Sequence, residues 1–163
     1  MPDRTIVLGV DPGLNTTGYG VLALSGGVMK LVDAGIVRPG AGGTLPDRLR
    51  ELHHDIGEIM DTHKPQAMAI EEIYSHYRHP RTAIIMAHAR GVLCLAAAQR
   101  DIPVRSIPST HIKRAVTGRG NAGKEQVNGM VCRLLGITGP ISPLDVSDAL
   151  AAAIAYCEEK DDA

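Results

Sequence analysis

A chain of 163 residues, 44% of them hydrophobic, is long enough to bury a core, so we expect one folded domain over residues 1–163. The chain has no apolar run of roughly 18 residues, no long N-terminal apolar stretch and no CxxC pair among its three cysteines. This composition argues against a membrane span, a signal peptide and a zinc or disulfide framework. The formal net charge of −1 hides an asymmetry: residues 73–124 hold nine basic residues and one acid, Asp101, which indicates a basic face for a polyanion or simply solvated helix surfaces.

Apolar runs separated by turn residues predict three strands and then a helix in the N-terminal part of the chain. The first run ends at Asp11-Pro12-Gly13, a tight-turn sequence, and Ser25-Gly26-Gly27 indicates a hairpin between the next two. After a glycine-rich loop, apolar residues recur every three or four positions, as in an amphipathic helix. These elements cover residues 5–10, 19–24, 28–37 and 45–63.

Strands and helices alternate in the rest of the chain. Two short buried strands flank a long helix that is apolar on more than one face, and a glycine-rich basic joint at residues 117–123 separates the next two helices. The elements cover residues 67–70, 81–100, 103–107, 109–116, 123–135 and 142–160. Three antiparallel strands followed by this alternation predict an α/β domain with a central five-stranded mixed sheet and helices on both faces.

Four acids fall where this arrangement brings them to one edge of the sheet. Asp11 and Glu71 each end an apolar strand, and sites in such sheets form outside the carboxyl ends of strands. Asp145 and Asp148 are three residues apart and share one face of the last helix. Converging carboxylates need cations to offset their repulsion, and the absence of Cys or His beside them favours Mg²⁺ or Mn²⁺.

Each acid also has a simpler explanation. Asp11 fits a turn, and Glu71 or its neighbour Glu72 fits a solvated residue beyond a strand end. Asp145 fits a helix-capping box. Asp148 is hardest to explain in this way, because it interrupts a small, apolar helix segment.

Several short motifs occur in order along almost the whole chain. They are residues 8–13 with 17–20, Ala69-Ile70-Glu71, Ala89-Arg90-Gly91, Ile112-Lys113 with the joint that ends at Lys124, and residues 145–151. In this order and spacing they resemble the RuvC family of Holliday-junction resolvases. The resemblance implies a ribonuclease-H-like fold and an endonuclease that resolves four-way DNA junctions by paired symmetric nicks, in recombination and DNA repair.

The resemblance also implies roles for individual residues. Asp11, Glu71, Asp145 and Asp148 would be the catalytic acids that bind two Mg²⁺ ions per subunit, with Mn²⁺ as a substitute, for hydrolysis by an in-line water. Lys113 and Lys124 would lie near the scissile phosphate, in the chemistry or as phosphate contacts, and Tyr74 would stack near the junction centre. Residues 75–82 and His88 depart from the commoner family pattern. Further predicted DNA contacts are Asn15, Thr17, Arg78, Arg81, Arg114 and Arg119.

A symmetric pair of cuts calls for two active sites, so we expect a homodimer. The helix at residues 81–100 is the predicted interface, because it has more apolar surface than one core contact needs; a fully buried core helix is the alternative. The resemblance implies co-operation with the RuvA and RuvB branch-migration proteins. The cysteines favour buried thiols in the cytoplasm.

Three other functions fit parts of the pattern. An actin-like or sugar-kinase-like phosphotransferase shares the opening Asp and Gly pattern, but it needs a second comparable domain for which this chain has no room. A related ribonuclease-H-like nuclease would process ribosomal RNA precursors, a reading that Tyr74 and the long helix disfavour. A non-catalytic junction-binding module would not need all four acids.

Overall fold

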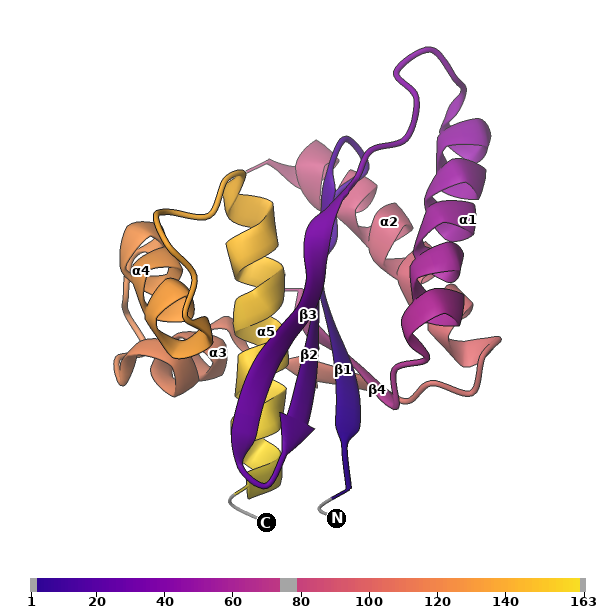
Figure 1. Ribbon diagram of the computed structural model, residues 1–163. Helices are drawn as coiled ribbons and strands as arrows, with labels where there is room; N and C mark the ends of the chain where they lie inside the picture. The colour runs from indigo at the N-terminus through magenta and orange to yellow at the C-terminus, as the bar shows by residue number, and fades with distance from the viewer. Residues whose placement is uncertain (1–2, 74–78, 162–163) are drawn as a thin grey trace.

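The computed structural model describes residues 3–73 and 79–161 and shows a sheet with helices on both sides (Figure 1). In the sheet, β1 pairs with β2 and β2 with β3 in antiparallel fashion, whereas β1 with β4 and β4 with β5 are parallel. The resulting order, β3-β2-β1-β4-β5, confirms the predicted five-stranded mixed sheet. The strands are β1 (Thr5–Asp11), β2 (Thr17–Ser25), β3 (Val28–Val37), β4 (Ala67–Glu71) and β5 (Val104–Ile107).

Helices cover both faces, as predicted. The helices are α1 (Leu45–His63), α2 (Pro80–Ala98), α3 (Ser109–Thr117), α4 (Lys124–Leu135) and α5 (Leu144–Asp161). Figure 1 shows α1 and α2 on one side of the sheet, and α5 on the other side with α3 and α4 beyond it. The boundaries agree with the sequence to within a few residues; α5 begins at Leu144, so Pro143 precedes the helix and is not its first residue.

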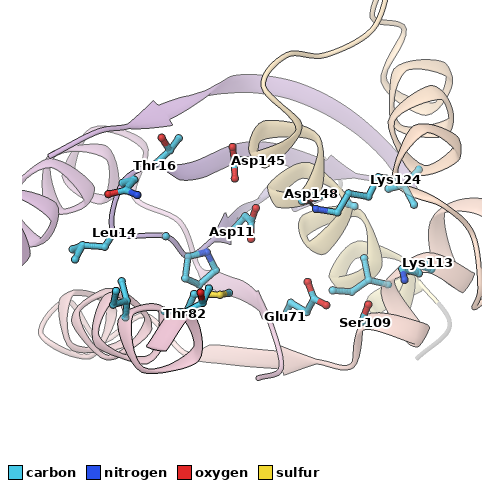
Figure 2. Close-up of a pocket in the computed structure, with 18 residues that line it drawn as sticks. Asp11, Leu14, Thr16, Glu71, Thr82, Ser109, Lys113, Lys124, Asp145 and Asp148 are labelled. Atoms are coloured by element: carbon cyan, nitrogen blue, oxygen red, sulfur yellow. Dashed lines mark ion pairs between the residues drawn. The ribbon is translucent and has the colours of Figure 1, made fainter. Parts of the chain in front are cut away.

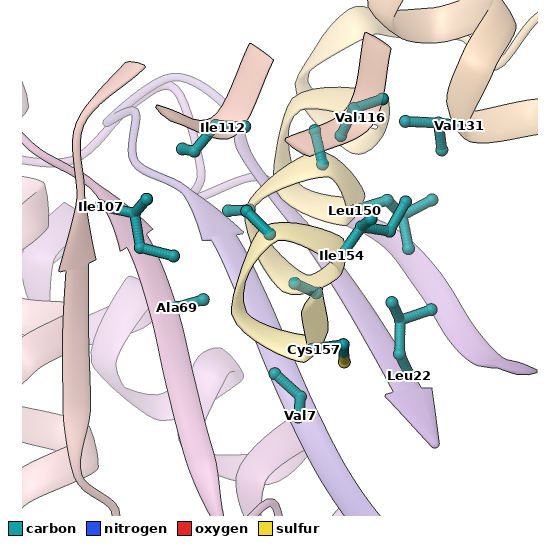
Figure 3. Close-up of a cluster of buried hydrophobic side chains, with 14 of the residues drawn as sticks. Val7, Leu22, Ala69, Ile107, Ile112, Val116, Val131, Leu150, Ile154 and Cys157 are labelled. Atoms are coloured by element: carbon teal, nitrogen blue, oxygen red, sulfur yellow. The ribbon is translucent and has the colours of Figure 1, made fainter. Parts of the chain in front are cut away.

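Successive side chains along the strands point to opposite faces of the sheet and belong to two hydrophobic cores. Val7 belongs to the core under α5, whereas the next residue, Leu8, belongs to the core under α1 and α2. Figure 3 shows the first of these cores, in which Leu150 and Ile154 of α5 lie over the strands. Almost every residue of α5 from Val146 to Cys157 is buried, apart from Asp148 and Tyr156, so α5 is the central helix of the domain.

Two glycines let α5 approach the sheet closely. A Cβ at Gly9 would overlap the backbone oxygen of Ala149, and a Cβ at Gly18 would overlap the backbone oxygen of Asp145. Gly18 is also the partner of Asp11 in the β1–β2 ladder. The first turns of α5 therefore rest directly on the strands at the level of Asp11, and any side chain at these two positions would push the helix away.

The helix α2 has a buried face and an exposed apolar face. By length and composition alone it is apolar enough to cross a membrane, although polar residues interrupt its apolar sequence. Its core face contacts α1 through Ala89, Leu93, Ala96 and Ala97. The opposite face exposes 60% of Ile84 and 52% of Leu95, and no described residue covers it. The prediction that this helix has spare apolar surface is confirmed, and the alternative of a fully buried helix is wrong.

Candidate active site

A cavity of about 640 Å³ opens where the carboxyl ends of β1 and β4 meet the start of α5. All four acids singled out in the sequence line it: Asp11, Glu71, Asp145 and Asp148. Figure 2 shows Asp11 in the middle, with Asp145 and Asp148 on one side and Glu71 on the other. The structure thus brings together residues that lie more than a hundred positions apart in the chain.

The fold explains why these carboxylates meet. Asp11 is the last residue of β1 and Glu71 the last residue of β4, and because these neighbouring strands are parallel, their ends lie at the same edge of the sheet. Glu72 is exposed and lines only a smaller adjacent recess, in agreement with strand alternation. Asp145 and Asp148 come from the first two turns of α5, which the contact with Gly18 holds against the strands.

The electrostatics of the cavity are dominated by buried negative charge. The pKa of Asp11 is raised from 3.8 to about 8, first by burial and then by the neighbouring Asp148, Asp145 and Glu71, whereas Lys124 acts to lower it. Burial also raises the pKa of Asp148, where Lys124 and Lys113 act in the opposite direction. A buried carboxyl with such a pKa lacks a compensating positive charge.

The donor set suits a hard divalent cation. Among the described residues, no three acidic, His or Cys side chains are close enough to form a ready-made metal cluster. The cavity nevertheless presents four carboxylates with neither sulfur nor imidazole beside them, which is the ligand chemistry of Mg²⁺ and Mn²⁺. The raised pKa of Asp11 is the effect that a bound cation would reverse, so the residues fit the predicted metal.

Two lysines reach the same cavity from the other side of the acids. Lys124, the first residue of α4, places its Nζ 3.8 Å from Oδ2 of Asp148, and Lys113 of α3 lines the cavity. Asn15 also lines it, on the loop between β1 and β2. Arg81, Arg114 and Arg119 are exposed and lie outside the cavity.

Some predicted DNA contacts are not supported. Thr17 is fully buried, and its hydroxyl donates to the backbone oxygen of Gly13 at 2.6 Å, so the prediction that Thr17 contacts DNA is wrong. Tyr74 and Arg78 lie outside the described residues. Two of the nine basic residues in the segment 73–124 are already paired with acids: Arg100 with Asp61 and Arg105 with Glu159. The positive charge available for DNA is therefore smaller than the count of basic residues indicates.

Several other residues at the site carry no signal in the sequence. Thr82, Ile85 and Met86 of α2 form one wall of the cavity, and Ser109 and Ile112 of α3 form another. Ser109 follows a strand and opens a helix, a position where serine is expected for local reasons. Its place beside Lys113 depends on how α3 packs on α5, which no local pattern reveals.

Comparison with known proteins gives a consistent result. The family described as "Crossover junction endodeoxyribonuclease RuvC" matches residues 7–156. The chain is 45% identical over 148 residues to the crossover junction endodeoxyribonuclease RuvC of Rhodopirellula baltica, covering 91% of this chain and 83% of that protein. With the RuvC of Chlorobaculum parvum it shares 44% identity over 153 residues, covering 94% and 80%. The structure of Thermus thermophilus RuvC in complex with Holliday junction substrate superposes with a TM-score of 0.89 at 30% identity, covering 96% of this chain and 94% of that one.

Proposed function

This chain belongs to the RuvC family of crossover junction endodeoxyribonucleases, and we infer that it cuts Holliday junctions at the cavity formed by β1, β4 and α5. The fold is the ribonuclease-H-like fold of that family. One observation carries the assignment of the site: four carboxylates from two strand ends and one helix line a single cavity together with two lysines. The proposed activity of that site is metal-dependent hydrolysis of a phosphodiester in a four-way DNA junction, in recombination and repair.

The acids have distinct places in this proposal. Asp11 lies between Glu71 on one side and the α5 pair, Asp145 and Asp148, on the other (Figure 2). In this arrangement Asp11, Glu71, Asp145 and Asp148 would hold the cations, with Glu71 acting from β4 and the other two acids from α5. When bound, Mg²⁺ ions in such a site supply positive charge for the phosphate oxygens and lower the pKa of a water molecule.

The remaining residues bind and orient the DNA. Lys124 and Lys113 place positive charge beside the carboxylates, where it offsets the charge of the scissile phosphate. Side chains of α2 and α3 form two walls of the cavity, beside the carboxylates. Arg81, Arg114 and Arg119 stay candidates for contacts to the backbone of the junction arms, because their side chains are exposed.

We also propose a homodimer formed through α2. The exposed residues Ile84, His88, Gly91, Leu95 and Ala98 alternate at spacings of four and three along the helix. Such a seven-residue repeat is typical of a helix that packs against another helix. A Cβ at Gly91 would meet nothing within 4 Å, so there is room at this position for the backbone of a second copy to approach.

Other parts of the proposal rest on the family alone. We propose one nuclease domain over residues 1–163, a cytoplasmic location and co-operation with RuvA and RuvB. The cysteines Cys94, Cys132 and Cys157 are free thiols, which agrees with a reducing compartment. An enzyme acting on ribosomal RNA precursors is the alternative that the cavity alone does not exclude, since it would use the same carboxylates.

A direct assay tests the proposal. Purified protein is incubated with a synthetic four-way junction, a linear duplex of the same sequence and an RNA hairpin, each with Mg²⁺ or with EDTA. We expect symmetric nicks in the junction alone and only with Mg²⁺. Cleavage of the RNA hairpin in preference to the junction, or junction binding without nicks, would overturn it.

A further inference from the structure

Arg48 of α1 reaches across to the loop that follows Asp11. Its Nη2 donates to Oδ1 of Asn15 at 2.6 Å and to the backbone oxygen of Leu14 at 3.3 Å. Arg48 itself does not line the acidic cavity, whereas residues 12–16 of the loop do. Arg48 therefore supports a loop that lines the cavity without lining the cavity itself.

We propose that Arg48 is a positioning residue that aims the side-chain amide of Asn15 at a phosphate of the DNA strand bound in the acidic cavity. This inference rests on the nuclease function proposed above and adds one substrate contact and its support. It assigns Asn15 as a phosphate-binding residue and Arg48 as the residue that fixes its orientation.

The chemistry of the pair determines which way the amide faces. A guanidinium only donates hydrogen bonds, so the atom of Asn15 that faces Arg48 has to be the oxygen. The amide nitrogen, with two N–H donors, then points away from Arg48. The Asn15 side chain is exposed and lines the cavity, so these donors are available to a phosphate oxygen there.

The orientation of Asn15 depends on Arg48, because the other side-chain hydrogen bonds of this loop are made between Thr17 and Gly13. On the inner side, the Thr17 hydroxyl donates to the backbone oxygen of Gly13 at 2.6 Å and accepts from the Gly13 N–H at 3.2 Å. Leu14 is also held by packing, because its side chain is buried. Asn15 is exposed, and within residues 3–73 and 79–161 Arg48 is the residue whose side chain bonds to it. Loss of Arg48 would free the Asn15 side chain while leaving the strand ends in place.

A purely stabilising role fits Arg48 poorly. Its Nε is buried and has no hydrogen-bond partner among the described atoms. Burying an unpaired donor costs free energy, which offsets part of what the two loop contacts contribute to stability. A role in orienting the loop through its two contacts with Leu14 and Asn15 explains why the unpaired Nε is tolerated.

A double-mutant cycle on junction cleavage tests the proposal. The variants are Arg48→Ala, Asn15→Ala and the double variant, and kcat/KM with a synthetic junction and Mg²⁺ is the readout. Each single variant should lose about tenfold, the size expected for one hydrogen bond to a charged group. The double variant should lose no more than either single one, because the two residues act as one unit.

Two further variants separate positioning from stability. Arg50→Ala is the matched control, since Arg50 lies two residues away on α1 and, among the described residues, pairs with Asp47 alone at the surface; it should keep wild-type kinetics. Asn15→Asp retains an oxygen for Arg48 but has no donor for a phosphate, so it should keep the unfolding midpoint and lose cleavage.

The outcomes are distinct. Additive losses, or a loss in Arg48→Ala with wild-type kinetics in Asn15→Ala, would overturn the route through Asn15. Wild-type kinetics in Arg48→Ala would show that Arg48 only packs. If the wild-type protein itself does not cut the junction, the proposed function fails before this inference is reached.

Discussion

The ammonium group of Lys124 lies 3.8 Å from a carboxylate oxygen of Asp148. Lys124 is 71% exposed and Asp148 25%, so the lysine reaches in from the surface to an acid that α5 holds partly buried. This contact joins the glycine-rich basic joint before α4 to the acidic cavity. It gives Lys124 an electrostatic role that Lys113 has more weakly, because Lys124 is the stronger of the two in lowering the pKa of Asp148 and also acts on Asp11.

Lys124→Met should therefore lower the rate of cleavage rather than the affinity for DNA. Without the lysine, the pKa values of Asp11 and Asp148 rise, and metal binding to them requires a higher pH. We expect kcat to fall by about 10- to 1000-fold at neutral pH. The pH at which the cleavage rate begins to rise should also be higher than in the wild type. Arg119→Met is the control, since this exposed residue lies outside the cavity and should affect binding alone. An unshifted profile in Lys124→Met would contradict this role.

Asp11→Asn should abolish cleavage and leave junction binding largely intact. The substitution keeps the shape of the side chain but removes the charge that lies between the other acids. Loss of a carboxylate that would hold a catalytic cation should abolish detectable cleavage, whereas DNA affinity comes mainly from phosphate contacts elsewhere. Nicking assays and gel-shift measurements, with Glu58→Gln of the exposed surface of α1 as control, distinguish these effects. Equal loss of binding and cleavage would show that Asp11 is structural.

Much of this fold and site could be predicted from the sequence because its signals are local. The apolar strand before Asp11 and the hairpin at Gly26 and Gly27, both at positive φ, depend on nearest neighbours alone. Asp11 and Glu71 each end an apolar strand, and Asp148 interrupts an apolar helix segment, so these acids stand out in the sequence. Other features depend on tertiary contacts: the burial of Thr17, the neutralisation of Arg105 by Glu159 and the reach of Arg48 to Asn15 join segments that no periodicity relates.

The proposed dimer gives a separate prediction for α2. Leu95→Glu places a charge at the centre of the exposed apolar face and should produce a monomer at micromolar concentration with an intact fold. Leu134→Glu is the matched control, because Leu134 is 40% exposed and belongs to α4, which lies on the opposite side of the sheet from α2 (Figure 1). Sedimentation gives the oligomeric state and circular dichroism the fold. If Leu95→Glu remains dimeric, the interface lies on another surface.

The buried acid also makes stability depend on pH in a defined direction. Asp11 has a folded-state pKa of about 8 against 3.8 in the unfolded chain, so between these values the folded protein binds the extra proton. Stability from this group is fully present below pH 4 and is lost as the pH rises to about 8, by at most roughly 6 kcal/mol. In EDTA, urea unfolding should therefore show a larger loss between pH 5 and pH 8.5 for the wild type than for Asp11→Asn. Added Mg²⁺ should restore the wild type at the higher pH, because a bound cation takes the place of the proton, and should have much less effect on Asp11→Asn. If the free energy of unfolding changes with pH in the same way in both proteins, the pH dependence does not come from Asp11.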